Sequence, residues 1–455
     1  MEVEHSTPLP LIKETRVINQ KQEIYFILLL MLLFVLFRYY HFPNIHFILL
    51  LIASLFSLYK PIYGFVFYLF SISFKAYLLL IPGVTFSRYF GIFFMVIMIF
   101  TIFRNQNKLN KKLVYISLLI LISETISSFY SLSISSFILQ SSLHALEMGI
   151  FFGIVYLPED NKRLIALTDL TCLFSLLLLS TIAYLSLKSG LFGYRVTISE
   201  NFNQNQLAIN LVFLCVIVFN FILLKAKKPI EVIIRSVIFL LGIIILFYTG
   251  SRSSMIGLIA GILFSLFYYF KKYSRGKKNI FIFLGIVMIF VLFIFNTGIF
   301  KTKEADFIAN RYSYENFLNI ENQMRYHIWK GYLENILPDY WLFGTGGARS
   351  ATLYSARYDI NAGGHNIIIA LLVEFGLLGL IIFGYFYVIT FLKSIKIIKQ
   401  EYNILPFIAS FVALIIVGIG ENIFSQKVLW FSMAMCWRLF LNKKQRARKL
   451  VKANA

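Results

Sequence analysis

The chain has 455 residues, of which 59% are hydrophobic and 14% are charged, and its mean hydropathy is +0.77. Soluble domains carry about 25% charged residues, so this composition excludes a soluble globular protein and predicts a polytopic membrane protein. The net charge of +22 would suit a nucleic-acid-binding protein only if a water-facing domain presented it, and no stretch of the sequence reads as such a domain. Nucleic acid is therefore not an expected partner.

Fourteen apolar segments have roughly the length needed to cross a ~30 Å hydrocarbon layer. They are 24–38, 45–59, 62–80, 87–103, 113–131, 134–156, 164–187, 206–224, 232–249, 252–270, 279–297, 366–392, 403–420 and 427–441. The predicted fold is all-α, a polytopic membrane helix bundle of about 14 transmembrane helices. The polar lead has no small-residue cleavage site after the first apolar segment, so we expect that segment to be retained as a span.

Lysine and arginine collect in alternate connections, which the positive-inside rule places in the cytoplasm. With an even number of spans, both termini are expected there too. The predicted organisation is a cytoplasmic N-terminal lead at 1–23, transmembrane helices 1 to 11 at 24–297, an extracytoplasmic loop at 298–365, transmembrane helices 12 to 14 at 366–441 and a basic cytoplasmic tail at 442–455. The expected location is the cytoplasmic (inner) membrane.

The three cysteines, Cys172, Cys215 and Cys436, all lie inside apolar segments. A thiol in such a setting usually serves as a small packing residue. This pattern predicts neither a disulfide framework nor a metal cluster, and no metal or other cofactor is expected.

The long loop contains the sequence IENQMRYHIWKGYLENIL at 320–337, whose apolar residues recur at helical spacing. We expect an amphipathic helix lying on the outer membrane surface. Arg325 and Trp329 stand one turn apart on it. Considered alone, Arg325 could be solvated and Trp329 could anchor the helix in the membrane interface.

The tenth segment opens with TGSRSSMIGLIAGIL, and Arg252 is the one charged residue in this stretch. Serines on either side can cap the helix start, but a cation at a helix N-terminus opposes the helix dipole. A bound anion would resolve this conflict, whereas the alternative is an arginine that reaches lipid headgroups. Gly257 and Gly261 predict close packing of this helix on another.

Two further polar stretches are expected on the outer face. The connection at 193–210 offers Arg195 together with Asn203, Asn205 and Asn210, which could bind a sugar or simply belong to a loop. The sequence GGHN at 363–366 places His365 and Asn366 at the outer end of the twelfth span, where His365 could be a functional group or a polar cap.

Glu374 lies nine residues beyond His365, roughly 13 Å deeper along the helix and on its opposite face, so we do not expect these two to pair. Only Lys75 and Glu374 are expected clearly inside the membrane. A transporter should keep more charged or broken positions near the midplane, so this pattern favours chemistry over transport of a lipid-linked sugar.

Three of these sequence stretches also carry a family resemblance. TGSRSSMIGLIAGIL, RYHIWKGYLENILPDYWLFGTGGARS and GGHNIIIALLVEFGLLGLIIF resemble successive segments of the bacterial O-antigen ligase and polymerase family, and YRVTISENFNQNQLAI resembles its upstream Arg and Asn segment. The resemblance implies a metal-independent, inverting membrane glycosyltransferase. Such an enzyme takes a glycan from undecaprenyl diphosphate outside the cytoplasmic membrane.

The resemblance also suggests roles for individual residues. Arg252 and Arg195 would stabilise the diphosphate leaving group, His365 would act as general base, and Arg325 would complete the anion site. Arg349 could take the place of Arg325. Further substrate-binding residues implied by these segments are Asn205, Asn366 and Trp329.

The implied partners are an undecaprenyl-diphosphate-linked glycan donor, a glycan or lipid A core acceptor, membrane lipids, a chain-length regulator and a flippase. A polymerase extends one lipid-linked chain with another, whereas a ligase transfers the chain to lipid A core. Fourteen spans favour a polymerase over the twelve that are usual for ligases. Against this, the Arg and Gly loop motifs described in some polymerases are absent at Arg195 and Arg325.

Overall fold

The structure is a computed structural model that describes residues 11–453 except for 41, 75–76, 82–83, 105–108, 130–133, 190–194, 199–202, 273–277, 298–302, 314–323, 347–348 and 360–363. Lys75 lies outside these residues. The side chain of Arg349 also lies outside the described part, although its backbone begins a helix.

The described residues are almost all helical. The first half of the chain forms α1 (Leu11–Tyr39), α2 (Pro43–Tyr59), α3 (Pro61–Ser73), α4 (Phe86–Arg104), α5 (Lys111–Ser128), α6 (Ile134–Tyr156) and α7 (Asn161–Lys188). A short antiparallel hairpin of β1 (Leu79–Ile81) and β2 (Val84–Thr85) follows α3, with Leu79 opposite Thr85 and Ile81 opposite Val84.

The second half forms four long helices, then a group of shorter ones, then three more that complete the bundle. These are α8 (Gln204–Leu224), α9 (Pro229–Tyr248), α10 (Arg252–Lys272), α11 (Lys278–Thr297), α12 (Lys303–Arg311), α14 (Met324–Asn335), α15 (Leu337–Tyr340), α16 (Arg349–Tyr358), α17 (Ile367–Ile398), α18 (Leu405–Gly418) and α19 (Lys427–Ala453). A 3-10 turn, η1 (Tyr402–Ile404), joins α17 to α18.

Each predicted apolar segment coincides with a helix, from α1 to α11 and from α17 to α19. Seven described helices are long and apolar enough to cross a membrane: α1, α4, α7, α8, α9, α10 and α17. Others are shorter than predicted, and α3 ends at Ser73 where we expected a span to 80, because the chain turns into the hairpin. The protein is an α-helical integral membrane protein, and the number of helices that cross the membrane stays a prediction.

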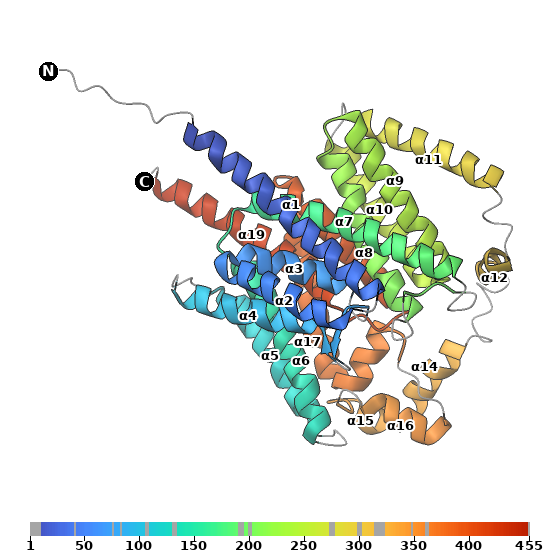
Figure 1. Ribbon diagram of the computed structural model, residues 1–455. Coiled ribbons are helices and arrows are strands. Elements are labelled where there is room, and N and C mark those ends of the chain that lie inside the picture. Colours follow the sequence, from blue (N-terminus) through green and yellow to red (C-terminus); the bar gives the residue numbers. More distant parts are fainter. Residues whose placement is uncertain are drawn as a thin grey trace.

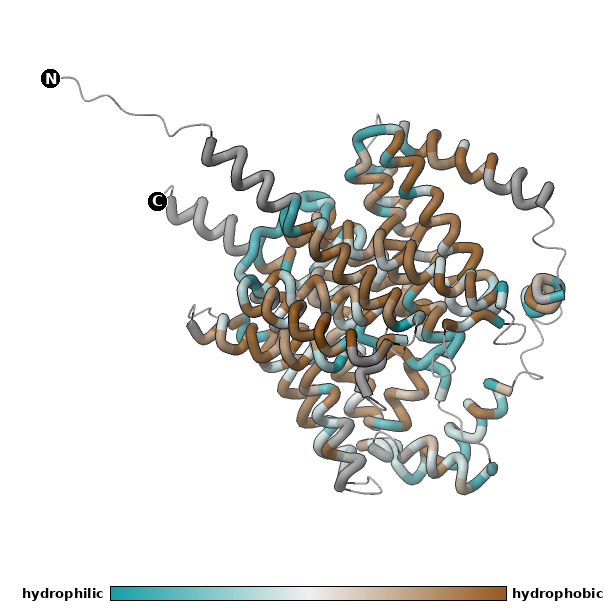
Figure 2. The backbone as a smooth tube through the Cα atoms, viewed as in Figure 1, coloured by the Kyte–Doolittle hydropathy of each residue, from teal (hydrophilic) through white to brown (hydrophobic). Residues whose placement is uncertain are grey.

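The two chain ends and the long loop lie on opposite sides of the bundle. α1 enters and α19 leaves on one side, while α14, α15 and α16 lie at the other (Figure 1). Hydrophobic residues dominate the bundle, whereas α14 to α16 mix hydrophilic and weakly hydrophobic ones (Figure 2). Which of these two sides faces the cytoplasm stays a prediction.

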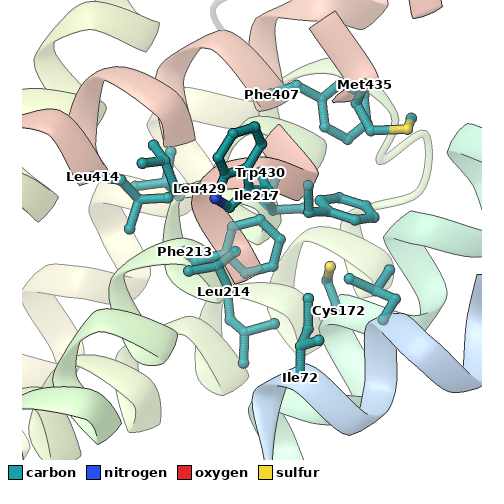
Figure 3. Close-up of a cluster of buried hydrophobic side chains, with 14 of the residues drawn as sticks. Ile72, Cys172, Phe213, Leu214, Ile217, Phe407, Leu414, Leu429, Trp430 and Met435 are labelled. Carbon is teal, nitrogen blue, oxygen red and sulfur yellow. The ribbon is translucent and has the colours of Figure 1, made fainter. Parts of the chain in front are cut away.

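Helix α8 is the centre of the bundle, and every residue from Leu207 to Leu223 is buried. It is apolar on all sides because helices surround it, as expected for a core helix. Figure 3 shows its neighbours around Phe213, Leu214 and Ile217: Ile72, Cys172, Phe407, Leu414, Leu429, Trp430 and Met435. All three cysteines are buried, which confirms their prediction as packing residues.

The predicted close approach of α10 to another helix is confirmed. A β-carbon at Gly257 would lie 2.7 Å from the Ala413 carbonyl oxygen, and one at Gly261 would lie 2.9 Å from the Ala413 side chain. Both positions face α18. Glycine lets the two backbones come closer than any side chain would allow.

The predicted amphipathic helix is present as α14, but it packs on protein where we expected the membrane surface. Its residues Ile328 and Tyr332 are buried against Ile369 and Val373 of α17. Tyr354 of α16 stacks on Tyr332, with ring centroids 4.8 Å apart. The apolar face of α14 is therefore covered by α16 and α17, which fixes this helix over the outer end of α17.

Helix α17 is interrupted at Gly376, where φ is +69°. The segment from Trp341 to Gly346 pairs with the broken turn: Leu377 donates its N–H to the Trp341 carbonyl at 2.8 Å, and Gly346 donates to the Glu374 carbonyl at 3.1 Å. These bonds satisfy backbone groups that the break frees, as irregular backbone inside a membrane protein requires. They also join the loop helices to the bundle.

The predicted number of interior charges was too low. The structure buries Glu374 as expected, and it also buries two ion pairs between neighbouring helices. These are Glu124 with His144 at 2.6 Å, and Asp169 with Arg235 at 2.5 Å. Sequence windows missed them because a single charge hardly changes the mean hydropathy of a long apolar segment.

Candidate functional site

The turn between α9 and α10 forms the base of the site. Gly250 has φ of +64°, a backbone conformation that favours glycine, and ends α9 in a tight turn. Arg195 donates from Nε to the Thr249 carbonyl at 2.7 Å, and Val196 donates its N–H to the Tyr248 carbonyl at 3.0 Å. The outward segment that precedes α8 is thus fastened to the C-terminal end of α9.

The other end of the Arg195 guanidinium reaches α8. Its Nη2 donates to Oδ1 of Asn205 at 3.0 Å, and Asn205 lies in the first turn of α8. Asn203 caps this helix by accepting the Asn205 N–H at 2.8 Å. Asn205 therefore holds Arg195 in position, while the side chain of Asn203 caps the backbone at the start of α8.

Helix α12 brings a further arginine to the same turn. Arg311 donates from Nε to the Gly250 carbonyl at 3.4 Å. A β-carbon on Gly250 would lie 3.0 Å from Ile308, 3.2 Å from the Arg195 Nε and 3.3 Å from the Arg311 Nε. Glycine at 250 thus allows two guanidinium groups to approach one turn of backbone.

Helix α14 brings Arg325 to the start of α10 from another side. A β-carbon on Gly420, which follows α18, would lie 2.7 Å from Ser253 and 3.2 Å from Nη1 of Arg325. Arg252 precedes Ser253 and lies within electrostatic range of Arg311 and Arg325. Four arginines from separate parts of the chain therefore converge around the first turn of α10.

Glu421 joins Arg325 to His365. One carboxylate oxygen accepts from Nη2 of Arg325 at 2.5 Å, and the other lies 3.4 Å from Nδ1 of His365. The Glu421 side chain is only 7% exposed, which strengthens both interactions by excluding water. As expected, His365 does not pair with Glu374; its carboxylate partner is Glu421.

Two neighbours fix the backbone around His365. Trp329 donates from Nε1 to the Gly364 carbonyl at 2.8 Å, and His365 itself has φ of +42°. Asn366 caps α17 through Oδ1, which accepts the N–H groups of Ile368 and Ile369, and its Nδ2 donates to the Ile419 carbonyl at 2.9 Å. The positive φ is uncommon outside glycine and occurs often at functional positions.

Burial is the main cause of pKa shifts in the loop residues of the site, and neighbouring arginines modify them. Burial lowers the pKa of Arg195 to about 10, and the positive charges of Arg311 and Arg325 add to this effect while Glu421 opposes it. Burial raises the pKa of Tyr312 to about 12, against the pull of the neighbouring arginines. Tyr312 therefore stays protonated at neutral pH and remains a hydrogen-bond donor.

The structure brings together most of the residues singled out from the sequence. Arg195, Arg252, Arg325 and His365 lie in one cluster, with Asn205 and Trp329 holding members of it. Asn366 lies at its edge, and its amide is engaged in capping. Asn210 is elsewhere, because its amide donates to carbonyls at the end of α3.

Three residues of the site escaped sequence reasoning: Glu421, Arg311 and Tyr312. Glu421 is the carboxylate of a short connection between two apolar segments, GIGEN at 418–422, and that isolation was a usable signal. Arg311 and Tyr312 lie in a polar loop, where charged residues are ordinary. Among the described residues, no group of three or more His, Cys, Asp or Glu side chains is placed to hold a metal ion.

Comparison with known families gives this geometry a context. Residues 237–384 match the sequence model of a family described as O-antigen ligase. The matched range contains Arg252, Arg325 and His365, whereas Arg195 and Glu421 lie outside it. A search of curated proteins finds no match. The arginine cluster thus lies largely in the matched part of the chain, and this match supports assignment of the protein to the O-antigen ligase/polymerase family.

Proposed function

We propose that the protein transfers a glycan from undecaprenyl diphosphate to a hydroxyl group of an acceptor on the outer side of the cytoplasmic membrane. The observation that carries this proposal is the convergence of four arginines on the start of α10 beside the His365–Glu421 pair. Guanidinium groups and a helix N-terminus both favour phosphate. The imidazole lies where an acceptor hydroxyl could approach.

The reaction is a single displacement at the anomeric carbon. The acceptor oxygen forms a bond to the anomeric carbon while the bond between that carbon and the phosphate oxygen breaks. The proton of the acceptor hydroxyl passes to His365. Because Nδ1 faces Glu421, the other ring nitrogen, Nε2, is the one that takes the proton, which later returns to water. The anomeric configuration is inverted.

The arginines stabilise the diphosphate that leaves. Its negative charge grows as the glycosidic bond breaks, so positive groups already in place lower the energy of the transition state. Glu421 links Arg325 to His365, and Arg195 is held at the Gly250 turn. We propose that no divalent metal is required.

We favour a polymerase, which extends one lipid-linked chain with another, because the fourteen predicted segments exceed the twelve spans usual for ligases. Transfer to lipid A core is the alternative. The interior ion pairs Glu124–His144 and Asp169–Arg235 support a second candidate, a transporter of lipid-linked sugars, because such groups occur on transport pathways.

One experiment separates these functions. Purified protein is incubated with an undecaprenyl-diphosphate glycan and each acceptor in the presence of a metal chelator. A ladder of products supports the polymerase, and a single transfer to lipid A core supports the ligase. Absence of any product would overturn glycosyl transfer and favour transport.

Matched variants test the assigned residues. Arg252→Ala and His365→Ala should abolish product while the protein remains inserted. Arg357→Ala and His327→Ala are the controls, because both residues belong to the outer loop helices and neither belongs to the cluster. Full activity in a first-named variant would remove the role assigned to that residue.

A further inference from the structure

The arginines divide into two groups along the first turn of α10. Arg195 and Arg311 meet at Gly250, whereas Arg325 lies with Ser253 around Gly420 and pairs with Glu421 beside His365. We call Arg195, Arg311 and Tyr312 the distal group, and Arg325, Glu421 and His365 the proximal group. Arg252 stands between them in the chain. Because Ser253 lies three positions after Gly250, the α-carbons of these two residues are no more than about 11 Å apart.

Tyr312 gives the distal group a feature that the proposed mechanism does not use. Its ring stacks on Phe247, with centroids 5.5 Å apart and planes inclined by 16°. Its hydroxyl oxygen is buried and has no hydrogen-bond partner in the described part of the chain. An unsatisfied buried hydroxyl costs about 1–3 kcal/mol, which an anionic ligand oxygen would recover.

The surroundings of this hydroxyl favour an anion. The positive charges of Arg311, Arg195 and Arg252 all act on Tyr312. Within the described residues, the carboxylate placed among the arginines is Glu421, which Arg325 and His365 already occupy. The distal group therefore keeps an excess of positive charge and a free donor, which is what a second phosphate requires.

The position of His365 indicates which phosphate of the donor lies by each group. His365 acts at the sugar, so the phosphate that carries the sugar lies by the proximal group. A phosphate linked to it on the far side, which carries the lipid, then falls by the distal group.

We propose that Arg311 and Tyr312 bind the lipid-side phosphate of the donor and thereby select diphosphate-linked over monophosphate-linked lipid carriers. This inference rests on the proposed function for the identity of the donor. The tyrosine hydroxyl donates to a phosphate oxygen, and Arg311 supplies charge while its Nε bond to Gly250 holds it in place.

The test measures binding of farnesyl diphosphate and farnesyl monophosphate to the full-length protein in detergent. We expect the wild type to bind the diphosphate about tenfold or more tightly than the monophosphate. Tyr312→Phe keeps the stacked ring and removes only the hydroxyl, so it should weaken diphosphate binding by about tenfold and leave monophosphate binding unchanged. Arg311→Lys, which keeps the charge but loses the planar donor fork, should reduce the preference in the same direction.

Tyr354→Phe is the control, because Tyr354 belongs to the same outer loop but packs on Tyr332 and Tyr358. Equal wild-type affinity for the two ligands, or an unchanged preference in Tyr312→Phe, would overturn the inference. The transfer assay tests the proposed function separately: diphosphate selection without any glycan transfer would overturn that function and leave the phosphate site standing. Glycan transfer without diphosphate selection would support the proposed function and overturn the phosphate site.

Discussion

Two regions of this protein gather ionisable groups, one in the buried interior and one at a partly exposed site, and they balance charge differently. In the bundle interior, Glu124 pairs with His144, whose charge Glu147 and Glu374 also influence, and Asp169 pairs with Arg235. At the outer site, four arginines surround one carboxylate among the described residues. The two interior cations have carboxylate partners, whereas the arginine cluster keeps an excess of positive charge.

This difference separates a structural role from a functional one. A buried charge without a partner is expensive, so a fold that needs only stability pairs its charges. An excess of guanidinium groups around a helix start destabilises the protein until an anion arrives. The excess of arginine over carboxylate therefore distinguishes the candidate site from these two interior pairs.

The largest effect is expected from removing one member of an interior ion pair. Asp169→Ala leaves Arg235 buried without its carboxylate and should lower the free energy of unfolding by about 3–5 kcal/mol. Thermal unfolding in detergent measures this change. The double variant Asp169→Asn with Arg235→Met should recover most of the loss; a double variant as unstable as the single one would contradict the pairing argument.

Glu421→Gln tests the arginine cluster of the candidate site. It removes the charge that holds Arg325 and orients His365, so the rate of glycan transfer should fall by about 10²–10³-fold. Affinity for farnesyl diphosphate should stay the same or increase, because the site becomes more positive. A parallel loss of binding and turnover would show that Glu421 supports the fold of the site and has no separate role in the reaction.

Gly376→Ala tests the backbone that joins the outer loop to the bundle. The positive φ alone costs about 1–3 kcal/mol in a residue with a side chain, and the new β-carbon would also collide with the Leu342 carbonyl. Unfolding and transfer should both be affected. Gly384→Ala is the control in the same helix, because open space surrounds that position and alanine there should be neutral or slightly stabilising.

The smallest effect is expected for Trp329→Phe, which sharpens the comparison within the site itself. The variant loses the hydrogen bond to the Gly364 carbonyl, worth about 0.5–1.5 kcal/mol, and should reduce transfer roughly two- to tenfold. The loss should appear mainly in kcat, since His365 is displaced and the arginines are not. Trp341→Phe, at an exposed position, should leave kcat unchanged.

The sequence by itself determined the class of the protein and singled out several residues of the candidate site. Long apolar segments can only be satisfied as helices in lipid, so the bundle could be read from hydropathy. Arg252 could be read as a candidate because a cation at a helix start conflicts with the helix dipole, a local effect visible within a few residues. Gly257 and Gly261 predicted a close helix contact, because two small residues four positions apart are visible in the local sequence.

Only the tertiary structure decided which charges share a site. Glu421 lies 56 positions from His365 and 96 from Arg325, and nothing in local spacing relates residues so far apart. The predicted number of interior charges was also too low, because a single charged residue hardly changes the mean hydropathy of a long apolar segment. Pairing depends on which helices are neighbours, and packing over the whole bundle determines that neighbourhood.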